Sequence, residues 1–291
     1  MSTLQLTQLL NWKELRRGCS RAGCHTLTLR YPLLTRKTGV RVGTEWYCSP
    51  ECLREGLELR ICELQRPSND PPARRDARIP LGLLLVSRGC ITQLQWQRAQ
   101  DVQRERGGEI GDILCNLNFA TERQVAEASA TQWGCPVFTA KPQLAEIQAR
   151  VPATLMKLIN MAPVHYAPAS NRLLVGFVYH VQHRVLRTIE DMTSCVAEPC
   201  FITATDCCDT IRSLNGLHVE VSFESPLSTS EIANIIQSYA DQIGADEARL
   251  ALCEDYLWVR LNRDGHPTDL LFDIRGRARK TSLIDYLDIT S

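Results

Sequence analysis

A duplicated stretch decides much of the expected fold: Pro80–Gln103 reads PLGLLLVSRGCITQLQWQRAQDVQ, and Glu109–Gln132 reads EIGDILCNLNFATERQVAEASATQ. Each copy has 24 residues, and a shift of 29 positions places Gly82 on Gly111. Apolar side chains recur every three to four residues, a spacing typical of helices with one buried face. Each copy therefore predicts a short helix, a turn and a second helix.

The composition changes on both sides of this repeat. Upstream, residues 66–77 contain three prolines among clustered charges, which predicts a linker because proline cannot donate a backbone hydrogen bond. Downstream, a helix near Leu144–Met161, strands at Pro163–Ala167 and Leu173–Tyr179 and a helix at Val181–Met192 are expected. This alternation is typical of a small α/β subdomain.

The C-terminal segment opens with His218–Phe223, which alternates like a half-buried strand. An amphipathic helix follows, and Tyr256–Leu261 and Asp269–Ile274 predict two further strands joined by a hairpin turn. The sequence therefore predicts an α+β multi-domain chain. Its expected parts are a small zinc-finger module at 1–65, a linker at 66–77, a helical tandem-repeat subdomain at 78–136, a small α/β subdomain at 137–214 and a βαββ module at 215–291.

Four of the 13 cysteines form two close pairs upstream of the linker. Cys19 and Cys24 are separated by four residues, and Cys48 and Cys52 by three, so each pair fits one turn and the four thiolates can converge on a tetrahedral zinc ion. Four protein ligands leave no open coordination position, so the expected zinc is structural. The competing interpretation is that these thiols are small buried hydrophobes.

The segments around these cysteine pairs predict the rest of the module. Residues 26–31 and 38–42 are expected to form a hairpin, and residues 46–52 a strand that runs into a helix. Over residues 15–62 the sequence resembles a treble-clef-like four-cysteine zinc finger. The basic residues of this module suggest an alternative function, nucleic-acid binding: Arg16, Arg17, Arg21, Arg30, Arg36, Lys37 and Arg41.

A second group of cysteines lies downstream of the repeat, at Cys195, Cys200, Cys207 and Cys208. With two nearby histidines they offer a second metal site or a thiol nucleophile. Small buried thiols in a reducing compartment are the simpler interpretation.

The repeat also carries a family resemblance. It rests on residues at matching positions of the two copies: Leu81, Gly82, Leu85, Val86 and Gln103, then Ile110, Gly111, Leu114, Cys115 and Gln132. These residues resemble the tandem 24-residue motifs of the MshE N-terminal domain, which is found in type II secretion and type IV pilus assembly ATPases. The spacer length and the order of the downstream segments agree, so the resemblance covers about residues 78–214.

The resemblance implies that each motif binds part of cyclic di-GMP. It implies that the glycine and the helix-start backbone accommodate the ligand, that the apolar positions cover the guanine faces and that the final glutamine bonds to it. The chain departs from the family pattern at Pro80 and Glu109, where the motif has arginine. The competing interpretation is a helical packing unit with apolar core positions and with glutamines that cap the helices or face solvent.

Charge and motif content narrow the expected function. The 33 basic and 33 acidic residues balance, so the whole chain has no net charge that would attract nucleic acid or anionic lipid. No apolar stretch reaches the roughly 20 residues that a membrane-spanning helix requires. No segment has the phosphate-loop spacing G-x-x-x-x-G-K-[ST]. We therefore expect a cytoplasmic, non-enzymatic regulatory or adaptor protein that binds cyclic di-GMP and proteins of the secretion or pilus machinery. The alternative is a protein-interaction scaffold that has lost nucleotide binding.

Overall fold

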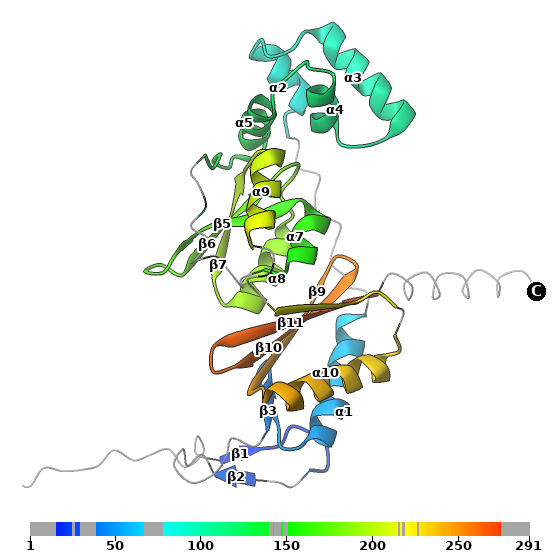
Figure 1. Ribbon diagram of the computed structural model, residues 1–291, viewed down its shortest axis with the longest axis vertical. Coiled ribbons are helices and arrows are strands. Elements are labelled where there is room, and N and C mark those ends of the chain that lie inside the picture. The colour runs from blue at the N-terminus through cyan, green and yellow to red at the C-terminus, as the bar shows by residue number, and fades with distance from the viewer. Residues whose placement is uncertain are drawn as a thin grey trace, which may run out of the picture. The chain divides into compact units, whose positions relative to one another are not determined.

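The chain folds into two compact units, residues 1–66 with 221–291 (unit 1) and residues 67–220 (unit 2). The computed structural model in Figure 1 describes residues 16–24, 27–29, 39–66, 78–139, 142, 147, 151–214, 216, 219–225 and 227–274. This grouping corrects the expectation of separate modules at 1–65 and 215–291. The two ends of the chain share one core instead.

A six-stranded sheet organises unit 1, with the strand order β4-β3-β9-β10-β11-β8. Its strands are β3 (Val40–Val42), β4 (Glu45–Tyr47), β8 (Val219–Phe223), β9 (Glu247–Cys253), β10 (Tyr256–Arg263) and β11 (His266–Asp273). The short hairpin β3–β4 joins the C-terminal strands because β3 pairs in parallel with β9, Val42 beside Ala248. The pairing of β3 with β9 explains why the N-terminal segment does not form a unit of its own.

Two helices, α1 (Pro50–Leu64) and α10 (Thr229–Ile243), pack against each other and against this sheet. Alternate residues of β10, such as Leu257 and Val259, point into the core that the helices cover. Ser228 caps α10 in a reciprocal hydrogen-bond arrangement with Glu231. The predicted strand–helix–strand–strand order is therefore present, with β9 as one additional strand.

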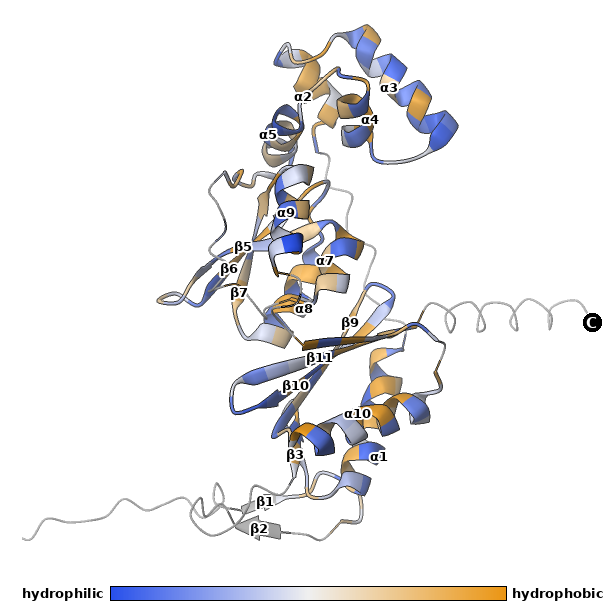
Figure 2. Cartoon of the chain, in the orientation of Figure 1, coloured by the Kyte–Doolittle hydropathy of each residue, from blue (hydrophilic) through white to orange (hydrophobic). Residues whose placement is uncertain are grey.

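The repeat forms two helical hairpins in unit 2, as the sequence predicts. They consist of α2 (Leu81–Ser87), α3 (Gln93–Arg106), α4 (Ile110–Asn116) and α5 (Glu122–Trp133). Thr92 caps α3 and Thr121 caps α5, each in a capping box with a glutamine three residues later. Helix α3 is predominantly hydrophilic (Figure 2), and Ala99 is its buried residue.

The rest of unit 2 is a three-stranded sheet, in the order β5-β6-β7, with three accompanying helices. Its elements are α7 (Ala153–Ile159), β5 (Met161–Ala167), β6 (Arg172–Phe177), α8 (His183–Thr193), β7 (Val196–Phe201) and α9 (Ala204–Leu214). Within the helix expected near 144–161, the structure describes α7 and a helical residue at Ile147, and the rest of 143–150 lies outside the described residues. Strand β7 and helix α9 were not predicted. In the part of the chain that the structure describes, no helix is long and apolar enough to cross a bilayer.

Candidate functional site

The four cysteines of the N-terminal segment converge in space. The sulfur atoms of Cys19, Cys24, Cys48 and Cys52 all lie within 4.8 Å of one another. The Sγ atoms of Cys24 and Cys48 are 3.6 Å apart, and those of Cys48 and Cys52 are 3.8 Å apart. Tetrahedral zinc at its usual Zn–S distance of about 2.3 Å requires sulfur separations of about 3.8 Å. The donor set therefore fits a four-thiolate metal site.

Local structure holds each cysteine pair in place. Strands β1 (Arg16–Gly18) and β2 (Leu27–Leu29) pair antiparallel and flank the loop with Cys19 and Cys24. Two hydrogen bonds tie this loop to β4: the Ser20 amide donates to the Trp46 carbonyl at 2.8 Å, and the Trp46 amide donates to Ser20 Oγ at 3.1 Å. Because β2 pairs with β1, and β3 with β4, the hairpin expected between residues 26–31 and 38–42 is wrong.

The second pair lies where β4 runs into α1, as predicted. Ser49 is the N-cap of α1, and its hydroxyl accepts a hydrogen bond from the Cys52 amide at 3.3 Å. The Arg21 guanidinium lies 3.8 Å from Cys52 Sγ and forms an ion pair with Glu55 at 2.7 Å. The hydrogen bonds with Ser49 and Arg21 lower the pKa of the Cys52 thiol, which favours the thiolate that a metal ion requires.

The basic face suggested for nucleic-acid binding is partly neutralised. Two of its arginines have described side chains, and both form ion pairs: Arg21 with Glu55, and Arg41 with Glu247 at 3.3 Å. The remaining five side chains of that face lie outside the described residues. Cys62, which lies outside the four-cysteine cluster, is exposed on α1.

The two motif glycines are buried within the helical hairpins, and their missing side chains make room for protein atoms. A Cβ atom at Gly82 would lie 2.1 Å from the Trp96 indole, and one at Gly111 would lie 2.9 Å from Val125 Cγ1. In both copies the glycine therefore lets the second helix approach the first. This packing role favours the competing interpretation of a helical packing unit, and the accommodation of a nucleotide by these glycines stays a prediction.

The apolar motif positions also belong to the core of the repeat. Leu85 and Leu114 are fully buried in one cluster with Leu84, Ile113 and Ala99. The other four apolar positions of the motifs are half-buried and pack against that cluster: Leu81, Val86, Ile110 and Cys115. Leu85 and Leu114 are therefore used for internal packing, and their assignment as binding residues stays a prediction.

Each motif-final glutamine bonds to the backbone carbonyl of the residue that directly precedes the other copy. Gln103 Nε2 donates to the Gly108 carbonyl at 3.0 Å, and Gln132 Nε2 donates to the Ile79 carbonyl at 2.7 Å. Positions 79 and 108 correspond under the 29-residue shift. The last residue of each copy therefore hydrogen-bonds to the residue just before the start of the other copy. The glutamines therefore close the repeat on itself.

Three arginines near the motifs are engaged in local contacts, two of them with the end of α5. The Arg78 guanidinium lies 3.6 Å above the Trp133 ring, and Arg88 donates to Thr131 Oγ1 at 2.6 Å. Arg104 forms an ion pair with Asp101 on its own helix at 2.8 Å. These three arginines could otherwise take the place of the two arginines that the motifs lack. Their observed contacts are instead with neighbouring residues of the protein.

The downstream cysteines do not form a second metal cluster among the described residues, where only the four N-terminal cysteines converge. Cys195, Cys200 and Cys207 are buried, and Cys208 is exposed. Burial raises the pKa of the Cys200 and Cys207 thiols to about 12, which keeps them protonated and unreactive near neutral pH. These three buried thiols behave as the small hydrophobes that the sequence suggests.

Comparisons with known proteins concern only part of the chain, and no family model matches it. A structure of MshE with cyclic di-GMP is 19% identical, with a TM-score of 0.40, over 47% of this chain and 99% of that one. The XpsE N-terminal domain is 20% identical, with a TM-score of 0.38, over 47% of this chain and 94% of that one. Among curated proteins, 121 residues of this chain are 26% identical to the type IV pilus assembly ATPase PilB of Thermus thermophilus. This chain is therefore similar, over 41% of its length, to a pilus assembly ATPase of which it spans 14%.

Proposed function

We propose that this chain is a non-enzymatic, cytoplasmic adaptor that binds proteins of the pilus or type II secretion machinery. The similarity to PilB over 121 residues supports the connection with such machinery. The sequence has no phosphate-loop spacing, so the adaptor acts by binding and not by hydrolysing nucleotide. Incubation of the purified chain with ATP and Mg²⁺ is expected to release no phosphate above background, and steady turnover would contradict the proposal.

The burial of Gly82 beneath Trp96 is the observation that most shapes this proposal. MshE has been solved with cyclic di-GMP, so the same ligand is the natural candidate here. However, the glycines and the central leucines of both motifs are used for internal packing, and Pro80 and Glu109 stand where the family motif has arginine. We infer that the repeat has kept the helical fold and works as a scaffold that does not bind cyclic di-GMP.

Calorimetric titration of the full chain with cyclic di-GMP tests this inference. We expect no saturable heat up to about 100 μM ligand, a concentration at which sites of micromolar affinity are filled. Saturable binding below that concentration would restore the first hypothesis, that of a cyclic di-GMP-responsive regulator.

A double variant separates the two reasons for losing the ligand. P80R/E109R restores both motif arginines and leaves the packing of Gly82 against Trp96 unchanged. If internal packing closes the site, this variant also fails to bind cyclic di-GMP. Binding by the variant alone would show that the missing arginines, and not the packing, abolish recognition.

We further propose that the four-cysteine cluster holds one structural zinc ion. The four converged thiolates supply every position of a tetrahedral zinc ion, which favours a closed site. Metal analysis of the full chain is expected to return about one zinc ion per molecule, and less than about a tenth of an equivalent would contradict the proposal. C48S is expected to lose the metal, whereas C62S, which changes an exposed cysteine outside the cluster, keeps it.

A further inference from the structure

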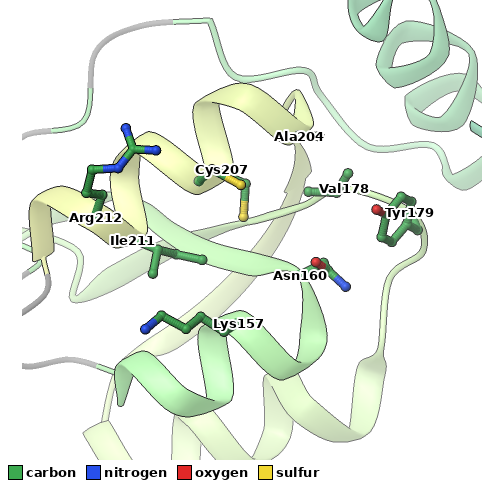
Figure 3. Close-up of a pocket in the computed structure, with 9 residues that line it drawn as sticks. Lys157, Asn160, Val178, Tyr179, Ala204, Cys207, Ile211 and Arg212 are labelled. Atoms are coloured by element: carbon green, nitrogen blue, oxygen red, sulfur yellow. The ribbon is translucent and has the colours of Figure 1, made fainter. Parts of the chain in front are cut away.

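A cleft lies between α7 and α9 in the α/β half of unit 2, away from the cysteine cluster and the motif residues (Figure 3). Its volume is about 410 Å³, within the range of about 300–1,000 Å³ that is typical of small-molecule sites. Buried apolar side chains line its wall, namely Val178, Cys207 and Ile211. The cleft can therefore remove an apolar body of small-molecule size from water.

Two cations stand at one end of this cleft. Figure 3 shows Lys157 on α7 and Arg212 on α9 at one end, with Tyr179 at the other. No aspartate or glutamate is among the residues that line the cavity. This end therefore carries positive charge with no acidic side chain in the lining.

Within the described part of the chain, neither Lys157 nor Arg212 is held in a buried ion pair, so both side chains can contact a ligand. Arg212 forms an ion pair with Asp209 at 2.7 Å, but both side chains are mostly exposed, so water screens the pair. Lys157 forms no ion pair with the described residues. At the other end, the Tyr179 hydroxyl donates to Asp112 Oδ2 at 2.6 Å, which occupies that carboxylate and fixes the ring.

We propose that this cleft binds a small organic anion whose apolar body lies against Ile211, Cys207 and Val178. Its anionic group lies between Lys157 and Arg212, since a carboxylate or phosphate gains charge-assisted hydrogen bonds from both side chains. None of these residues belongs to the repeat motifs or to the cysteine cluster. The site is therefore independent of the proposed adaptor function, and either can fail alone.

A pair of isosteric probes tests the charge requirement. The full chain is titrated with 1-naphthoate and with the neutral 1-naphthamide, and binding is followed by calorimetry or by protein chemical shifts. We expect saturable binding of naphthoate and at least about tenfold weaker binding of the amide, which corresponds to the loss of one charge-assisted interaction. Equal affinities, or no saturation by naphthoate at about 10 mM, would overturn the proposal.

Three variants locate the anionic group. K157Q and R212Q change exposed side chains, and each is expected to weaken naphthoate binding about tenfold while leaving naphthamide unaffected. R187Q removes an exposed cation from α8 that does not line the cleft, and it is expected to bind naphthoate like the natural chain. Unchanged naphthoate affinity in both K157Q and R212Q would contradict the placement of the anionic group between these two side chains.

Cysteine footprinting supplies an independent readout of position. Cys208 is exposed and lines the cleft, whereas Cys62 is exposed on α1. Bound naphthoate is expected to slow alkylation of Cys208 by iodoacetamide and to leave Cys62 unchanged, as measured on the separated peptides. Equal rates at Cys208 with and without saturating naphthoate would place the ligand elsewhere and contradict the proposal.

Discussion

The indole of Trp96 occupies the space into which a side chain at Gly82 would project. This contact brings the second helix of the first hairpin against the start of the first helix. Gly111 stands in the same relation to Val125 in the second hairpin, with more room. The glycine of the motif is thus required by packing even where no ligand is bound, and its presence alone does not identify a nucleotide site.

Replacing Gly82 by alanine is expected to destabilise the repeat. The new Cβ would lie 2.1 Å from the rigid Trp96 ring, so the helices must separate at a cost of about 1–3 kcal/mol. G111A meets one Val125 methyl group at 2.9 Å and is expected to cost less than G82A. Urea unfolding followed by circular dichroism compares the two, and an equal loss would argue against the packing explanation. W96A should reduce the penalty of G82A.

The reciprocal glutamine bonds make a second prediction. Q132A removes the hydrogen bond to the Ile79 carbonyl at 2.7 Å, and it is expected to cost about 0.5–1.5 kcal/mol. Hydrogen exchange should show faster opening at both the start of α2 and the end of α5, because the bond joins these two ends. An effect confined to α5 would mean that Gln132 stabilises only its own helix.

Removal of the proposed zinc ion is expected to loosen unit 1 beyond the cysteine loop. Cys52 belongs to the same apolar cluster as Val40, Leu57 and Leu257, so the thiolates and the sheet share one core. A zinc chelator should lower the unfolding temperature of unit 1 and speed hydrogen exchange in β3 and β4, while α2–α5 in unit 2 keep their protection. Unchanged exchange in β3 after the metal has been removed would show that the sheet holds without it.

A buried ion pair in the sheet of unit 1 is a further point of sensitivity. Arg260 donates two hydrogen bonds to Asp269, at 2.8 and 2.7 Å, and Trp258 Nε1 donates to the same carboxylate at 2.9 Å. D269A leaves the guanidinium buried without this partner and is expected to cost about 3–5 kcal/mol. E127Q breaks the exposed pair with Arg123 and should cost less than about 1 kcal/mol. Denaturant unfolding of both variants measures the contrast, and similar losses would contradict it.

Tyr179 predicts a loss of stability at high pH. Burial and the hydrogen bond to Asp112 raise the pKa of Tyr179 above its ordinary value of about 10. Below a pH of about 10, the Tyr179 hydroxyl is protonated in both the folded and the unfolded chain, so its hydrogen bond contributes fully to the free energy of unfolding. This contribution is lost as the pH rises from about 10 towards the folded pKa, because only the unfolded chain releases the proton. Y179F should weaken this decline in melting temperature, and Y166F should not.

Local patterns in the sequence predicted the helical repeat and the cysteine cluster because spacing alone fixes them. The capping threonines Thr92 and Thr121 mark both second helices, and the intervals between Cys19, Cys24, Cys48 and Cys52 suit two turns around one centre. By contrast, Glu247–Cys253 was missed as a strand since its glutamate, alanines, arginine and leucines are good helix formers. The β-sheet environment overrides that preference.

The roles of the repeat residues could not be read from their spacing. A glycine at a helix start suits both a ligand and a neighbouring helix, and only the position of Trp96 against Gly82 distinguishes the two. Likewise, the pairing of Val42 with Ala248 depends on segments far apart in the chain, for which local periodicity carries no signal. The prediction of independent terminal modules failed for that reason.

The parallel pairing of β3 with β9 has a consequence for biosynthesis. Strand β9 is synthesised roughly 200 residues after β3, and contacts of such separation form slowly. Unit 2 is continuous and is fully synthesised before β9 appears. The nascent chain can therefore complete unit 2 first, and the sheet that contains β3 is completed only after β9 has been synthesised.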